Sequence, residues 1–109
     1  MIFSRKKPVN NMFGLDSKTI EAIRKVLSQY PQVKQAKIFG SRALGTERPN
    51  SDIDIALWGQ ALDWKVLGSI QADLDEISSP YKFDVAGYHL TEHQGLREHI
   101  DRVGKPFYP

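Results

Sequence analysis

Short apolar segments with strand character alternate with amphipathic helical segments along most of this chain, and no other feature constrains its fold as much. Strands are predicted at residues 34–39, 53–58 and 83–86. Longer helices are predicted from Asp16 or Ser17, from Asp63 and from Thr91, where apolar residues recur at helical spacing. A short helix is predicted from Ser41. The order helix, strand, short helix, strand, helix, strand, helix predicts a two-layer α/β domain.

Capping residues and helix breakers set the predicted boundaries. Pro31 ends the first long helix. Thr91 and Gln94 form a capping box that opens the last helix, which stops at Gly104. Core or subunit contacts, rather than ligand stacking, are predicted for the aromatic residues Trp58, Trp64, Phe107 and Tyr108.

The composition bounds the class of protein. With 109 residues the chain has material for one domain. It has no cysteine, which excludes disulfides, thiolate zinc sites and cysteine nucleophiles. No apolar run reaches the roughly 18–20 residues of a membrane helix, and the N-terminal segment lacks the apolar stretch of a signal peptide. We therefore expect a cytoplasmic protein without a membrane association.

The net charge of +2 arises from 15 basic and 13 acidic residues, and three of the basic residues are Arg5, Lys6 and Lys7. This clustering predicts a flexible basic N-terminus over residues 1–12 and a folded domain over residues 13–109. So short a basic segment does not predict nucleic acid as a direct partner.

Asp52 and Asp54 are the residues that most clearly indicate chemistry. They stand at the start of a predicted strand, where residues two apart share a face, so their carboxylates repel unless a divalent cation lies between them. Mg²⁺ fits, because it prefers a few carboxylates together with substrate phosphates. Asp73 and Asp75 have the same spacing in a predicted helix, where residues two apart point to different sides. This second pair is interpreted as part of a solvated helix face.

Asp84 is the candidate for a third carboxylate. Its side chain points opposite to those of Phe83 and Val85 in an apolar strand, where a charged group needs a partner. The alternative is an edge-strand aspartate that faces water.

Gly40 and Ser41 indicate where a phosphate would bind. A strand that ends in glycine and serine at the start of a helix offers backbone N–H groups and a hydroxyl, and glycine lets a ligand approach the main chain closely. The structural alternative is a turn glycine followed by an N-cap serine.

Other motifs fail on individual residues. Thr46 and Glu47 replace the Lys-Ser/Thr pair of a P-loop. His89 and His93 have helical zinc spacing, but a helix capped at Thr91 would not bring them together.

The segment Gly40-Ser41, ten intervening residues and Asp52-Ile53-Asp54 resembles the DNA polymerase beta superfamily of nucleotidyltransferases. Together with Arg42, Gly45-Thr46 and Arg48-Pro49, it is similar to the prokaryotic minimal nucleotidyltransferases. The resemblance implies a two-layer nucleotidyltransferase fold, with a small mixed sheet and helices packed on one face.

The resemblance also implies the roles of the site residues. Asp52, Asp54 and Asp84 would be catalytic and would hold two Mg²⁺ ions. The predicted nucleotide-binding residues are Gly40, Ser41 and Arg42, with ATP as the nucleotide donor. Leu44 stands where many members carry a second arginine, so Arg42, Arg48 or a partner is expected to supply the positive charge.

Minimal nucleotidyltransferases commonly pair with a HEPN-type toxin and act as its antitoxin, and some transfer AMP from ATP onto a tyrosine of the toxin. The resemblance therefore implies a HEPN-type partner. The chain ends at Pro109 without the acceptor-binding domain of larger relatives, so we expect the acceptor to be a macromolecule or to bind at another subunit, in a homodimer or a hetero-oligomer. Two alternatives stay open: nucleotidylation of a small molecule such as an aminoglycoside, and a non-catalytic antitoxin that acts by contact only.

Overall fold

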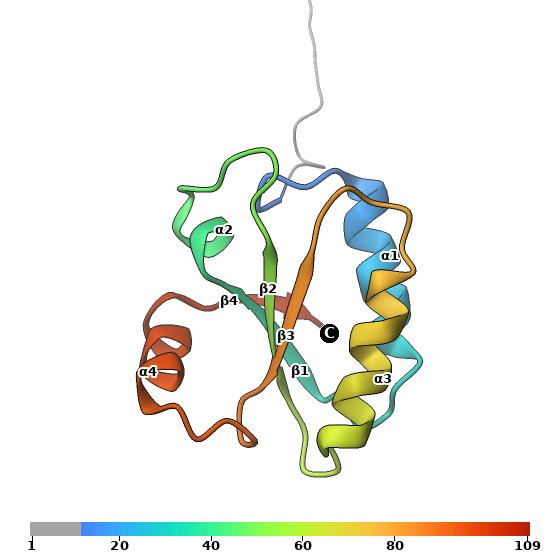
Figure 1. Cartoon of the computed structure of the whole chain (residues 1–109), viewed down its shortest axis with the longest axis vertical. Coiled ribbons are helices and arrows are strands. Elements are labelled where there is room, and N and C mark those ends of the chain that lie inside the picture. The colour runs from blue at the N-terminus through green and yellow to red at the C-terminus, as the bar shows by residue number, and fades with distance from the viewer. Residues whose placement is uncertain (1–11) are drawn as a thin grey trace, which may run out of the picture.

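The computed structural model describes residues 12–109. The expected flexible basic segment, residues 1–12, therefore falls almost wholly outside the described residues. Within these described residues, eight elements follow one another (Figure 1): α1 (Ser17–Ser28), β1 (Gln35–Phe39), α2 (Ser41–Leu44), β2 (Ile53–Trp58), α3 (Trp64–Asp75), β3 (Phe83–Gly87), α4 (Gln94–Val103) and β4 (Lys105–Tyr108). Among residues 12–109, no helix is long and apolar enough to cross a membrane.

The four strands form one mixed sheet in the order β3-β2-β1-β4. Strand β1 runs antiparallel to β2 and to β4, whereas β2 and β3 are parallel. The predicted α/β class and mixed sheet are confirmed. Strand β4 was not predicted, because Pro106 interrupts its apolar pattern and proline is tolerated only at a sheet edge, where β4 lies.

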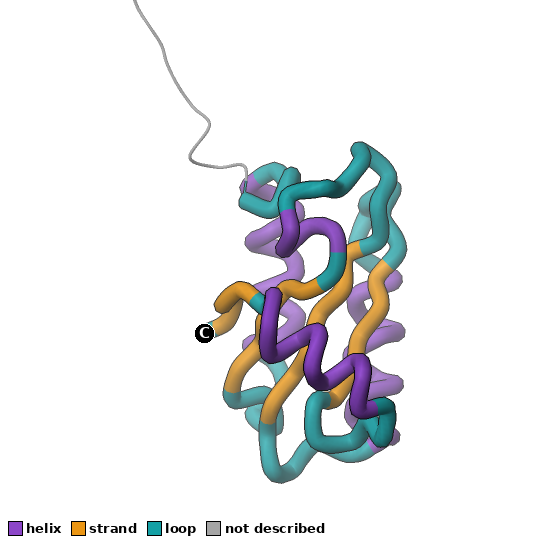
Figure 2. The backbone as a smooth tube through the Cα atoms, turned by 90° about the vertical axis from the view of Figure 1, so that its left-hand side faces the viewer, coloured by secondary structure: helices purple, strands orange, loops and turns teal. Residues whose placement is uncertain are grey.

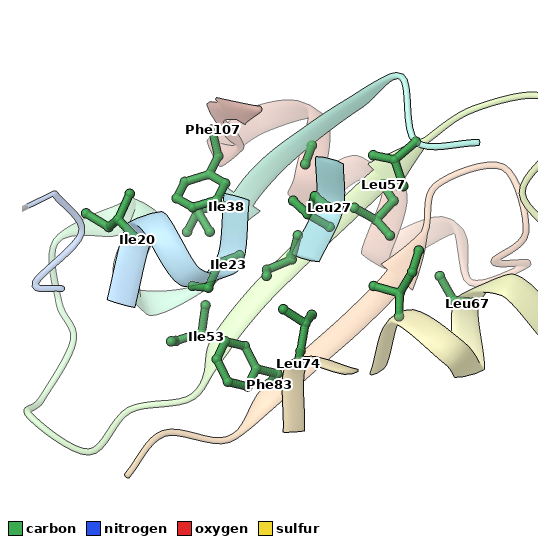
Figure 3. Close-up of a cluster of buried hydrophobic side chains, with 14 of the residues drawn as sticks. Ile20, Ile23, Leu27, Ile38, Ile53, Leu57, Leu67, Leu74, Phe83 and Phe107 are labelled. Carbon is green, nitrogen blue, oxygen red and sulfur yellow. The ribbon is translucent and has the colours of Figure 1, made fainter. Parts of the chain in front are cut away.

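Helices α1 and α3 cover one face of the sheet and enclose the main core (Figures 1 and 3). Alternate residues of the strands point into this core, among them Ile38, Ile53 and Leu57. The helices contribute Ile23 and Leu74, which are fully buried. Phe107 of β4 closes the core as a buried residue, as the sequence predicted.

Helix α4 packs on the opposite face of the sheet (Figure 2), so the expectation of helices on one face only is wrong for this helix. Its contact is a separate small cluster of buried residues, Phe39, Ala56 and Ile100. Phe39 and Ala56 directly follow Ile38 and Ile55 in their strands. Because successive strand residues point to opposite faces, and Ile38 and Ile55 face the main core, Phe39 and Ala56 face α4. The sheet thus has one thickly covered face and one that α4 covers only in part.

Local capping explains how the helices begin. The carboxylates of Asp16 and Asp63 accept backbone N–H bonds from Thr19 (2.9 Å) and Val66 (2.8 Å), so both long helices start where predicted.

Two other predictions need correction. The last helix is capped by His93, whose Nδ1 accepts the N–H of Leu96, and not by Thr91. Trp64 was expected in the core or at a subunit contact; as the first residue of α3 its side chain is 66% exposed, so it does not lie in the core.

Candidate active site

Two carboxylates occupy neighbouring positions on adjacent strands. Asp54 of β2 is the register partner of Asp84 of β3, and parallel register places both side chains on the same face of the sheet. This is the face that carries α4, because Ala56, two residues after Asp54, belongs to the α4 cluster. Asp52 lies directly before β2 and is exposed. The structure therefore places Asp54 and Asp84 side by side on this face, with Asp52 just before the strand and near enough for its charge to act on Asp54.

Asp54 is the carboxylate that the surroundings perturb. Half-burial, together with the negative charges of Asp84 and Asp52, raises the pKa of Asp54 to about 6, while the Arg42 guanidinium opposes this rise. Ionised Asp54 is thus poorly compensated by the protein itself.

This uncompensated charge fits a hard divalent cation, for which carboxylate oxygens are suitable ligands. Among residues 12–109, no three histidine, aspartate or glutamate side chains converge into a ready-made metal cage. An ion bound here would take some of its ligands from these carboxylates and complete its coordination with water or phosphate oxygens, which is the usual preference of Mg²⁺.

The turn between β1 and α2 lies against Asp54. Gly40 has φ of +73° and ψ of −153°, a backbone conformation open to glycine. A Cβ atom on Gly40 would lie 2.2 Å from Oδ2 of Asp54. Gly40 is also the N-cap position of α2 without any side-chain cap, and Ser41 is the first helical residue, so the alternative interpretation of Ser41 as an N-cap is wrong. The predicted phosphate-binding turn and the predicted metal-binding carboxylate are in direct contact.

His99 of α4 also contacts this turn, and sequence reasoning missed it. Its Nε2 accepts the backbone N–H of Gly40 at 3.2 Å, which requires that this nitrogen be unprotonated. The ring meets Phe39 edge-on, with 6.0 Å between ring centroids. The contact joins residues 59 positions apart in the chain, so no local motif could have predicted it.

Arg42 is placed differently from the expected nucleotide contact. Its side chain is only 2% exposed, and its guanidinium donates to the carbonyl oxygens of Phe13 (Nη1, 2.9 Å) and Ser51 (Nη2, 2.9 Å; Nε, 3.3 Å). It also lies 4.8 Å from the ring centre of Tyr81. Arg42 therefore ties together the turn before α1, the loop before Asp52 and the segment before β3.

The second aspartate pair, in α3, is not a purely solvated face as predicted. Asp73 accepts a hydrogen bond from the hydroxyl of Tyr30, just beyond α1. Asp75 accepts one from the side-chain amide of Gln71 at 3.2 Å. Both carboxylates thus have contacts within the fold, although they lie on α3, away from the sheet face that carries Asp54 and Asp84.

Comparison with known families assigns the chain to one of them. The family model described as "Polymerase beta, Nucleotidyltransferase" matches residues 21–109. The chain belongs to this nucleotidyltransferase family. The match includes all three aspartates and the glycine-serine turn. A search of curated proteins found no match.

Solved structures share the nucleotidyltransferase fold. A toxin-antitoxin crystallised with AMP-PNP is 26% identical, with a TM-score of 0.61 over 81% of this chain and 71% of the other. The toxin-antitoxin MntA-HepT is 21% identical, with a TM-score of 0.65 over 84% and 71%. A tri-AMPylated Shewanella oneidensis HEPN toxin in complex with MNT antitoxin gives 22% identity and a TM-score of 0.56 over 84% and 70%.

Proposed function

We propose that this nucleotidyltransferase transfers AMP from ATP to a hydroxyl group of a HEPN-type toxin and thereby acts as its antitoxin. The observation that carries the proposal is the contact between the Gly40 turn and Asp54, beside Asp84, in a chain of this family. The 26% identical toxin-antitoxin structure with AMP-PNP supports an adenine nucleotide as donor. The AMPylated toxin in the Shewanella oneidensis complex has the product chemistry that we propose here.

The proposed roles follow from the placement of the side chains. Asp52, Asp54 and Asp84 would hold Mg²⁺, which when bound lowers the pKa of an acceptor hydroxyl and neutralises charge on the leaving pyrophosphate. Gly40 leaves the main chain open to the triphosphate, and Ser41 offers its hydroxyl and its backbone N–H at the start of α2. We assign Arg42 to holding the surrounding loops, with its charge also favouring ionised Asp54.

The reaction needs no covalent protein intermediate. The acceptor oxygen attacks the α-phosphorus of ATP in line, the bond from that phosphorus to the bridging oxygen breaks, and pyrophosphate leaves. Asp84, which is exposed at the sheet end, takes the proton of the attacking hydroxyl directly or through water. Use of ATP as donor agrees with the cytoplasmic location that we expect.

The test combines the protein with labelled ATP, Mg²⁺ and the protein encoded by the neighbouring gene. We expect an AMP-sized mass on the partner, and we expect it to disappear in the variant Asp52→Asn/Asp54→Asn and in Asp84→Ala. The charge-matched control Glu21→Gln/Glu76→Gln alters two exposed residues, one in α1 and one just beyond α3, and should leave labelling unchanged.

Other outcomes would contradict the proposal in distinguishable ways. If the Asp52→Asn/Asp54→Asn protein neutralises the partner fully and no label appears, the protein is a contact-only antitoxin. If the label appears only on an added aminoglycoside, the acceptor is a small molecule. If labelling persists in all aspartate variants, the site lies elsewhere.

A further inference from the structure

The side chain of Gln71, in α3, is bonded to the backbone of the outermost strand. Its Nε2 donates to the carbonyl oxygen of Phe83 at 2.8 Å, and its Oε1 accepts the N–H of Val85 at 3.2 Å. One amide group thus makes a donor and an acceptor contact to two residues of β3, in the way that a neighbouring strand would.

Both bonded groups point away from the sheet. Strand β3 lies at the edge, next to β2 only. The carbonyl of Lys82 and the N–H of Tyr88 bond to β2. By alternation, Phe83 and Val85, which have odd numbers, direct their N–H and C=O groups to the free edge. Unpaired backbone groups at an edge are otherwise open to water or to another chain. Gln71 bonds to two of the backbone groups at this edge, the C=O of Phe83 and the N–H of Val85.

The residue between these two contacts is Asp84. Its backbone is therefore held on both sides: by β2 through the parallel ladder and by Gln71 through the residues that flank it. Gln71 is in turn held by Asp75, which accepts a second contact from Nε2 at 3.2 Å. Because the direction of the Cα–Cβ bond follows from the backbone, fixing Phe83 and Val85 fixes the direction in which the Asp84 side chain leaves the strand.

We propose that Gln71 is a positioning residue for Asp84. The proposal rests on the function proposed above for Asp84 and extends it to a residue on the opposite face of the sheet. Side chains that orient a metal-binding residue from outside its immediate contacts commonly change metal affinity or activity by about 10–100-fold when removed. We expect removal of the Gln71 contacts to lower the reaction rate and the cation affinity. Nucleotide binding should not change, because Gln71 does not contact the turn at Gly40.

The variant Gln71→Met keeps the length of the side chain and removes both hydrogen bonds to β3. We expect faster hydrogen exchange at the Val85 amide, greater backbone mobility at Asp84 in NMR relaxation, and a weaker apparent affinity for Mn²⁺ used as the metal probe. In the transfer assay we expect kcat to fall by about 10-fold or more while KM for ATP stays unchanged. Asp75→Ala should shift the same quantities in the same direction by a smaller factor.

The matched control is Gln94→Met. Gln94 is also helical and donates to a carboxylate four residues on, Glu98, at 3.3 Å, but it has no contact with β3. This variant should behave like the wild-type protein in all four measurements. Urea unfolding of each variant verifies that it is folded. If Gln71→Met does not fold, Asp75→Ala alone carries the test.

Each failure has its own signature. Unchanged Val85 exchange and Asp84 mobility in a folded Gln71→Met protein would overturn the proposal whatever the activity. So would greater mobility accompanied by wild-type kcat and wild-type Mn²⁺ affinity. If the wild-type protein transfers no nucleotide, the proposed function fails, and the mobility of Asp84 with and without Gln71 still decides whether Gln71 positions it.

Discussion

At the scale of single residues, the site depends on the absence of one side chain. Gly40 combines a positive φ with a position where a Cβ would lie 2.2 Å from the Asp54 carboxylate. A substitution there therefore meets both backbone strain and a direct clash. Only glycine satisfies both conditions, which makes Gly40 the most restricted position of the site.

Gly40→Ala should lower the free energy of unfolding by at least about 2 kcal/mol and abolish binding of Mg²⁺-ATP, because the turn and Asp54 must move apart. Urea unfolding and calorimetric titration measure the two effects. The control is Gly45→Ala, which has a similar φ of +77° but no atom within 4 Å of the added Cβ. It should cost about 1 kcal/mol from strain alone and leave nucleotide binding intact. Equal effects of the two substitutions would show that the contact with Asp54 is unimportant.

Asp54 should make the stability of the metal-free protein depend on pH. Its pKa is raised from 3.8 to about 6, so the folded protein holds this proton more tightly than the unfolded chain does. The contribution of this group to stability is therefore present below pH 3.8 and is lost as the pH rises through about 6. Thermal unfolding of wild type and Asp54→Asn in chelator, below and above this window, measures the effect.

We expect Asp54→Asn to gain in stability relative to wild type at the higher pH only, since asparagine carries no charge at either pH. Adding Mg²⁺ should stabilise the wild-type protein at the higher pH and have less effect on the variant. A constant difference between the two proteins across the window would contradict the raised pKa of Asp54.

At the scale of elements, buried Arg42 joins segments that are far apart in the chain. Lysine at this position would keep the charge but could not reproduce the planar set of donors to Phe13 and Ser51. Arg42→Lys should therefore lower the free energy of unfolding by about 2 kcal/mol and speed proteolysis of the loop that leads to Asp52. Arg48→Lys, at an exposed position in the same loop, should change stability by less than about 0.5 kcal/mol. Similar losses in the two variants would argue against Arg42 as the anchor.

The elements that sequence could predict are those whose signals are local. The caps Asp16 and Asp63 bond to N–H groups three residues away, so their pattern is visible in the sequence. The pairing of Asp54 with Asp84 follows from strand pattern once the two strands are neighbours. By contrast, β4, the face on which α4 packs, and the contacts of His99 and Gln71 all depend on residues brought together only by the tertiary fold. Arg42 was predicted to serve the site, but its buried position could not be predicted, because charged side chains are rarely fully buried.

At the scale of the whole molecule, residues 12–109 form two cores of unequal size on the two faces of one sheet. The main core lies under α1 and α3, and the small cluster around Ile100 holds α4. The proposed site is on the side of the small cluster, and His99 of α4 bonds to its glycine turn. The arrangement predicts that α4 opens more readily than the rest of the fold and that such opening releases the turn.

Ile100→Ala tests this link between the small cluster and the site. Ile100 and Ile23 are both fully buried, so truncating either creates a cavity that costs about 2–5 kcal/mol. Ile23→Ala should lower the stability of the entire domain, because it lies in the main core. Ile100→Ala should instead speed hydrogen exchange chiefly in α4 and weaken Mg²⁺-ATP binding, because His99 no longer holds the N–H of Gly40. If α4 exchanges faster while nucleotide affinity stays at the wild-type value, the helix does not support the turn, and the contact between His99 and Gly40 serves packing alone.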